Sequence, residues 1–248
     1  VNALGGEVRG RASLREGKQF ALKVQVGNLS LDRVSRASGV GPLAFNSRVS
    51  GPLELTATLS GNSVRDVATE GRLTLAATEG ENPLSGTVDL AFRQRDQSIA
   101  FRDSRLELAN SFVALSGNIR DSILVTANTK RFEDFLPALA LVSESPETIV
   151  PVSLGQNGVA SFAGTLRGDW RNPVVEGSVS GRLVQYDGRS VDEIAAQGEV
   201  DRNRIQVSSL VARKDDMEIR GSFALPLQEW KPDRSGTISA ALNLSANN

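Results

Sequence analysis

Short runs in which aliphatic and polar residues alternate recur from one end of the chain to the other. In one of the clearest, Leu53, Leu55, Ala57 and Leu59 alternate with polar residues, and Gly61 follows the run. Neighbouring side chains of a strand point to opposite faces, so each run predicts a β-strand with one apolar and one polar face. Similar runs occupy 20–26, 73–77, 88–92, 113–115, 217–219 and 238–244. About fourteen such strands and very little helix predict an all-β protein.

Turn signals separate the runs. Gly51-Pro52 and Asn62-Ser63 are typical of turns between strands. Asp187-Gly188 predicts a two-residue hairpin, because this dipeptide favours the left-handed angles of a type I′ turn.

Two segments depart from the alternation. Ser30 can cap a short helix near 30–38 that Gly39 would end. Between 131 and 142, Phe132, Phe135 and Leu139 fall on one helical face, although Pro137 limits this second helix to a short or bent one.

The segment 143–157 contains two prolines and is predicted to be a loop or linker. It divides the chain into a first block of strands, 1–142, and a second block, 158–248, which we expect to continue the same sheet. The chain begins with Val rather than Met, and no run approaches the roughly 20 apolar residues that span a bilayer, so we expect a soluble segment of a longer protein.

The composition removes most catalytic chemistry. The chain has no His and no Cys, which excludes Ser-His-Asp and Cys-His catalysis and thiolate or imidazole metal sites. The densest acidic spots, Asp215-Asp216 and Glu79 with Glu81, lie between strands, where solvated turn charges are the ordinary explanation. The net charge is −1 without a basic stripe, which argues against nucleic acid as a partner. We therefore expect a protein that is not an enzyme, without catalytic residues, metal or cofactor.

The continuous apolar face is the remaining candidate for function, because such a face has to be covered in water. The sheet can fold onto itself or close as a barrel, which gives an ordinary packed core. Alternatively it can curl into a half-pipe whose lining is covered by acyl chains. Periodicity alone favours the packed core.

The stretch 158–173, GVASFAGTLRGDWRNP, and its continuation through 177–191 resemble the AsmA-like/TamB superfamily of bacterial envelope proteins. The strand and short helix of 20–39 are of the same style. The resemblance implies a long antiparallel sheet curled into a U-shaped, taco-like groove with a hydrophobic interior. It also implies a periplasmic location, a parent protein anchored in the inner membrane, and a role in moving phospholipid to the outer membrane. The family has no catalytic residues to carry over.

We therefore expect a segment of a lipid-transfer protein whose groove carries phospholipid acyl chains. The alternative is a structural or chaperone module that assists outer-membrane biogenesis by pairing its edge strands with an outer-membrane β-barrel protein. The residues expected to line the groove lie near strand centres: Leu55, Leu75, Leu90, Leu115, Phe162, Leu183, Val207 and Ile219.

Overall fold

The computed structural model describes residues 2–37, 43–60, 63–138, 152–169, 172–233 and 235–246. Within these ranges the protein is all-β, as the sequence predicts, with sixteen strands, the helix α1 (Leu31–Ala37) and the 3-10 turn η1 (Phe132–Phe135). The strands are β1 (Asn2–Ala3), β2 (Gly6–Arg15), β3 (Gln19–Ser30), β4 (Ser47–Ser60), β5 (Ser63–Ala77), β6 (Ser85–Arg93), β7 (Ser98–Glu107), β8 (Ser111–Asn118), β9 (Ser122–Thr129), β10 (Val152–Asp169), β11 (Asn172–Tyr186), β12 (Arg189–Val200), β13 (Arg204–Lys214), β14 (Met217–Gln228), β15 (Lys231–Pro232) and β16 (Ser239–Ala246).

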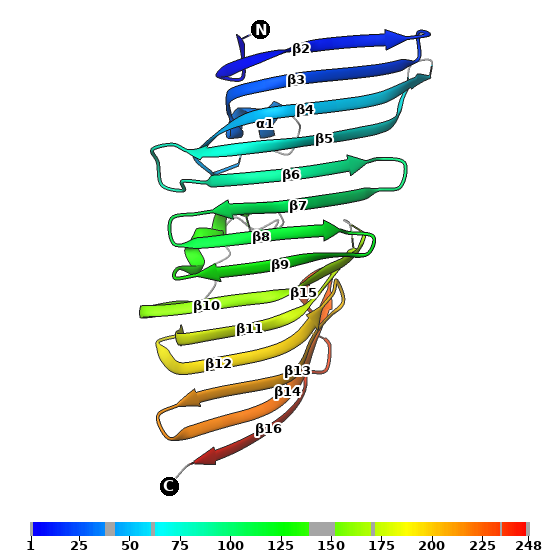
Figure 1. Cartoon of the computed structure of the whole chain (residues 1–248). Helices are drawn as coiled ribbons and strands as arrows, with labels where there is room; N and C mark the ends of the chain where they lie inside the picture. Colours follow the sequence, from blue (N-terminus) through cyan, green and yellow to red (C-terminus); the bar gives the residue numbers. More distant parts are fainter. Residues whose placement is uncertain are drawn as a thin grey trace.

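All strands belong to one antiparallel sheet, in which consecutive strands from β1 to β15 pair with each other (Figure 1). At the far end β14 pairs with the short β15 and, over eight residue pairs, with β16. Since β9 pairs directly with β10, one sheet runs through both predicted blocks. The sheet is not closed into a barrel, so β2 and β16 lie near its opposite ends.

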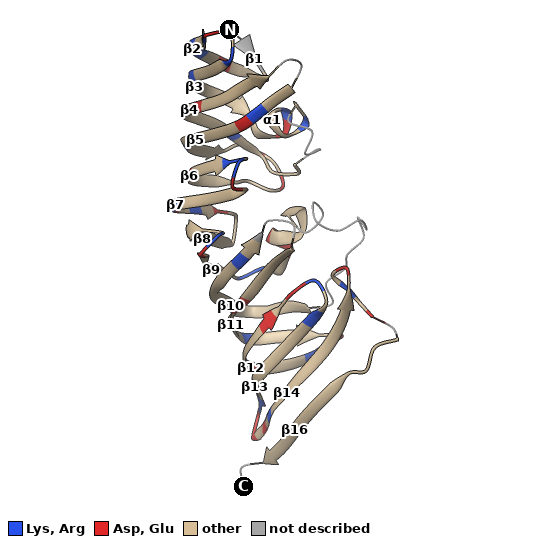
Figure 2. Ribbon diagram, turned by 90° about the vertical axis from the view of Figure 1, so that its right-hand side faces the viewer, with Lys and Arg blue, Asp and Glu red and all other residues tan. Residues whose placement is uncertain are grey.

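The sheet curls along its length, and α1 and η1 lie on the side toward which it curls (Figure 2). Strand twist and β-bulges produce such curvature. The register shifts at several places, among them Val26/Leu29, Phe101/Ser104 and Val207/Leu210. The result is an open groove with a hydrophobic interior.

Both predicted helices appear, in shorter form. The first is α1, one residue inside the expected bounds, while Gly39 lies outside the described residues. The second consists of η1 and a helical turn through 136–138, and 139–142 lie outside the described residues.

Two turn and loop predictions were wrong. Gly51-Pro52 lies inside β4, where a bulge in the neighbouring strand accommodates it. Residues 152–157, predicted as part of a linker, form the start of β10, while 143–151 lie outside the described residues. The Asp187-Gly188 hairpin is confirmed, since both residues have positive φ (48° and 73°) and Tyr186 pairs with Arg189.

The packed core is small for a chain of this length. One buried cluster consists of Val49, Leu75 and Leu84, with Leu31 of α1 packed against it. Most other aliphatic side chains of the sheet are only partly buried, because no second sheet covers them among the described residues.

Candidate functional site

The register of the sheet sorts its side chains into two faces. In an antiparallel pair, residues directly opposite each other project to the same side. Leu22, for example, lies opposite Leu55, and Leu115 lies opposite Val125. Following such pairs from β2 to β16 defines one continuous side, which we call the apolar face. Its aliphatic and aromatic residues include Val8, Ala12 and Leu14 (β2), Leu22 and Val24 (β3), Leu53 and Leu55 (β4), Leu73 and Leu75 (β5), Val88 and Leu90 (β6), Phe101 and Leu106 (β7), Val113 and Leu115 (β8), Ile123 and Val125 (β9), Phe162 and Leu166 (β10), Val175 and Val179 (β11), Ile194 and Ala196 (β12), Val207 and Leu210 (β13), Ile219 and Phe223 (β14), and Leu242 and Leu244 (β16).

The opposite side, which we call the charged face, carries ion pairs between strands. Lys23 lies 2.7 Å from Glu54 across β3 and β4. Arg167 of β10 reaches Glu176 at 3.0 Å and Glu199 at 2.9 Å, and so joins three strands. These ion pairs lie on the side of the sheet opposite to the apolar face.

A second charged cluster surrounds Glu218 of β14. Its carboxylate accepts hydrogen bonds from Arg220 and from Arg213, which also binds Glu193 of β12. These hydrogen bonds lower the pKa of Glu218 and raise that of Arg213. Glu218 therefore stays ionised at neutral pH, and the cluster ties β12, β13 and β14 together.

Glycines on the apolar face are covered by bulky neighbours. Gly164, Gly177 and Gly198 lie directly opposite one another on β10, β11 and β12. A Cβ atom would lie 2.7 Å from Phe162 Cζ at Gly164, and 2.9 Å from Phe162 Cε2 at Gly177, so the phenyl ring occupies the space that both glycines leave. Leu242 covers Gly221 in the same way. Missing side chains on this side also let the sheet bend inward.

The structure brings seven of the eight predicted lining residues onto the apolar face. They are Leu55, Leu75, Leu90, Leu115, Phe162, Val207 and Ile219. They belong to β4, β5, β6, β8, β10, β13 and β14, and therefore extend over most of the sheet.

Leu183 does not follow the alternation. It has a φ of 54° and lies where the pairing of β10 with β11 shifts between Leu154 and Val159. Val184 takes its place beside Ile194, since a Cβ at Gly181 would lie 2.8 Å from Val184 Cγ2 and 3.1 Å from Ile194 Cγ2. A left-handed residue interrupts the alternation of a strand, and the Leu183 side chain is 40% exposed.

Burial separates Leu75 from the other lining residues. Leu75 is 8% exposed and belongs to the packed cluster with Val49 and Leu84. Leu55, Leu90, Leu115, Phe162 and Val207 are half-buried, and Ile219 is 38% exposed. Leu75 therefore has a structural role, whereas the others lie on a surface that a ligand can reach.

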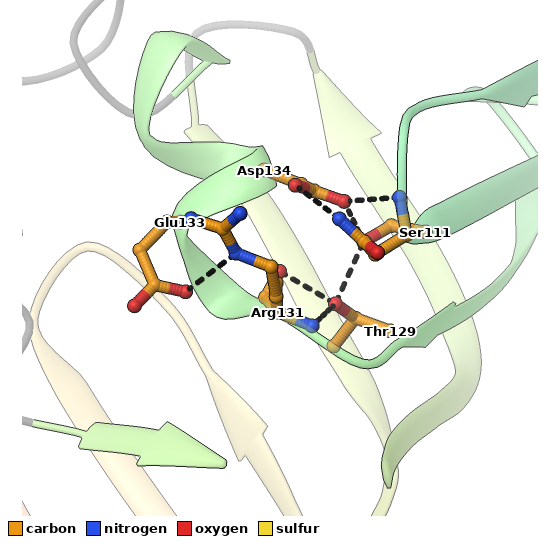
Figure 3. Close-up of polar contacts among 6 residues, drawn as sticks. Ser111, Thr129, Arg131, Glu133 and Asp134 are labelled. Carbon is orange, nitrogen blue, oxygen red and sulfur yellow. Dashed lines mark hydrogen bonds and ion pairs between the residues drawn. The ribbon is translucent and has the colours of Figure 1, made fainter. Parts of the chain in front are cut away.

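Sequence reasoning missed a polar cluster at one margin of the groove (Figure 3). The Asp134 carboxylate of η1 accepts hydrogen bonds from the Ser111 hydroxyl and from the backbone N–H of Asn110, both at 2.8 Å. The Ser111 and Thr129 hydroxyls lie 2.6 Å apart, and the backbone of Arg131 bonds to Thr129 Oγ1. The cluster fastens η1 to β8 and β9. Its members come from two separate segments of the chain, 110–111 and 129–134, and no local sequence motif predicts that the two segments meet.

The part of the chain that the structure describes contains no group of side chains suited to hold a metal ion. No helix in the same ranges has the length and hydropathy needed to cross a membrane.

A comparison of the chain with protein-family models, with curated proteins and with solved structures finds no match.

Proposed function

We propose that this chain is a periplasmic segment of an envelope-spanning lipid-transfer protein, whose apolar face carries phospholipid acyl chains between the inner and outer membranes. The observation that supports the proposal is an aliphatic face that continues from β2 to β16 on a sheet that stays open. The resemblance of 158–191 to the AsmA-like/TamB superfamily points in the same direction.

Hydrocarbon suits this face better than a polar ligand does. Its centre consists mainly of Leu, Val, Ile, Phe and Gly residues, whose side chains offer no hydrogen-bond donor or acceptor, with Thr69 opposite Leu55 and Ser104 opposite Leu115 as polar exceptions. Covering such surface is favourable by about 25 cal/mol per Å², whereas burying an unpaired polar group there costs free energy. The acyl chains would lie on the apolar face, and the headgroups would remain in water beside the strand ends.

The dimensions suit a track rather than a single binding site. Fourteen steps between neighbouring strands at about 4.8 Å give a length of roughly 65 Å. Even an eight-residue strand such as β8 spans roughly 27 Å, which exceeds the length of an acyl tail. Several lipids can occupy such a face in succession, and none of its positions selects a headgroup.

Mass spectrometry of lipid extracted from the purified chain tests this proposal. We expect phospholipid to co-purify, and the chain to take up fluorescent phospholipid from vesicles. A chain that is folded, carries no lipid and takes up none would contradict the proposal.

One observation favours a second candidate function, a module that assists outer-membrane protein assembly by strand pairing. All eight residues of β16 are exposed and none is charged, whereas β2 at the opposite end carries Arg9, Arg11 and Arg15. Uncharged edge strands are prone to pair with other strands. Photo-crosslinking from Asn243 to a β-barrel client, together with a lipid-free purified chain, would favour this function over lipid transfer.

A further inference from the structure

One margin of the apolar face is covered by the protein itself. Leu31, the first residue of α1, packs against the cluster of Val49, Leu75 and Leu84, and each member of this cluster is at most 8% exposed. Phe45 and Leu108, which lie outside the strands, pack against the same cluster. The protein's own side chains therefore cover this part of the face and bury Val49, Leu75 and Leu84.

A second cover lies farther along the same margin. Ser111 and Thr129 lie opposite each other at the start of β8 and the end of β9, on the apolar face by register, and both are buried. Asp134 bonds to Ser111 and thereby places η1 over this end of the strands. In a sheet of antiparallel neighbours, the end of β3, the start of β4, the start of β8 and the end of β9 share one margin. Figure 1 shows α1 and η1 toward that margin.

The strand centres lack such a cover. Leu55, Leu90 and Leu115 are half-buried and do not belong to the packed cluster, and Phe162 is half-buried on β10. These residues form a strip that follows the length of the sheet beside the covered margin.

We propose that α1 and η1 are fixed crossbars that exclude acyl chains from one margin and confine them to the strip along the strand centres. This inference rests on the proposed lipid-transfer function and adds the path that the lipid takes. The packed cluster excludes hydrocarbon because an entering chain would have to part Leu31 from Val49 and Leu75. At β8 and β9 the hydrogen bonds of Asp134 hold η1 in the corresponding position.

Photo-labelling with a phospholipid that carries a diazirine at the end of one acyl chain tests the path. The lipid is supplied in vesicles of phosphatidylethanolamine and phosphatidylglycerol, and labelled residues are located by fragmentation of tryptic peptides. We expect labels at Leu90, Leu115 and Phe162. Labels at Val49, Leu75 and Leu84 should be at least about tenfold rarer, a factor that corresponds to about 1.4 kcal/mol.

The outcomes separate this inference from the function on which it rests. Equal labelling of the packed cluster and the central strip would refute the exclusion of acyl chains by α1 and η1, and would leave the proposed lipid binding intact. A complete lack of labelling in folded protein would overturn the proposed function itself.

The role of η1 is tested with Asp134→Ala, and Glu133→Ala serves as the matched control. Glu133 neighbours Asp134 on η1, but its carboxylate is paired with Arg131 at 3.8 Å rather than with a strand. Releasing η1 by Asp134→Ala should spread the labels to Ser111 and Thr129, the buried residues at the start of β8 and the end of β9, and Glu133→Ala should not. An unchanged pattern in Asp134→Ala would show that η1 does not confine the lipid.

Discussion

Single glycines shape the apolar face as much as its aliphatic side chains do. Gly177 lies opposite Gly164, and a Cβ atom there would be 2.6 Å from the Ala163 carbonyl oxygen and 2.7 Å from Gly164 Cα. Backbone atoms cannot move aside as a flexible side chain can. The glycine therefore permits both the close approach of β10 and β11 and the position of the Phe162 ring.

Gly177→Ala should lower the free energy of unfolding by about 1–3 kcal/mol, the usual cost of overpacking. Gly27→Ala is the matched control, because the nearest heavy atom to a Cβ at Gly27 is 3.9 Å away. We expect the control to stay within about 0.5 kcal/mol of the parent in urea unfolding. Equal stabilities of the two variants would contradict this account of the glycines.

Acid should weaken the Glu218 cluster. Hydrogen bonds from Arg220 and Arg213 lower the pKa of Glu218 below its ordinary value of 4.5. A lowered pKa in the folded state stabilises the protein above the unfolded-state pKa, and this contribution is lost as the pH falls through the folded-state pKa. Glu218→Gln should therefore be less stable than the parent at pH 7, and the difference should shrink toward about pH 3. Urea unfolding of both proteins at both pH values measures this difference in stability. A difference that does not shrink toward about pH 3 would refute the stabilising role of the ionised Glu218.

Alternation in the sequence predicts a side chain's face wherever the strand is regular, and this suffices for Leu55, Leu90 and Leu115. It fails at Leu183, because a leucine gives no signal that its φ will be positive at a bulge. It also cannot distinguish the buried Leu75 from the half-buried Leu90. The burial of Leu75 depends on Leu31 and Leu84, which reach it from other parts of the chain.

At the scale of elements, the strands are longer than the alternating runs that predict them. β4 continues through Gly51-Pro52, and β10 begins at Val152, because bulges absorb residues that interrupt a regular ladder. Glycine and proline in this chain therefore mark bends of the sheet as well as turns between strands. The two short helical elements were predictable from Ser30 and from Phe132 and Phe135, but their common margin depends on the topology of the sheet.

The attachment of η1 to the sheet gives an element-scale prediction. The backbone N–H of Asn110 donates a hydrogen bond to the Asp134 carboxylate at 2.8 Å. Asp134→Ala should remove this acceptor and accelerate hydrogen exchange at the backbone amide of Asn110. Glu133→Ala should leave this exchange rate unchanged. Slow exchange at Asn110 in Asp134→Ala would show that η1 is held in another way.

At the scale of the whole molecule, the sheet remains open because the strands near its two ends, β2 and β16, do not pair with each other. Strands alternate with period two in an open groove and in a barrel alike, so periodicity does not distinguish the two arrangements. On periodicity alone, the ordinary packed core is the favoured prediction. The sheet of the structure is open, as a groove requires. The apolar face is consequently a surface, and its partial exposure is the property on which the proposed lipid transfer depends.

The most direct test of lipid transfer uses two neighbouring residues on opposite faces of β9. Val125 lies on the apolar face opposite Leu115, whereas Leu124 lies on the charged face and is 56% exposed. Val125→Glu and Leu124→Glu add the same charge to the same strand, and urea unfolding establishes that both variants are folded.

The rate at which each variant moves fluorescent phospholipid between vesicles is then measured. A charge in the path of the acyl chains has to be desolvated, so Val125→Glu should slow transfer by about tenfold or more, while Leu124→Glu should stay within about twofold of the parent. Equal transfer rates in two folded variants, or a Val125→Glu variant that unfolds because the face is ordinary core, would contradict a lipid-carrying groove.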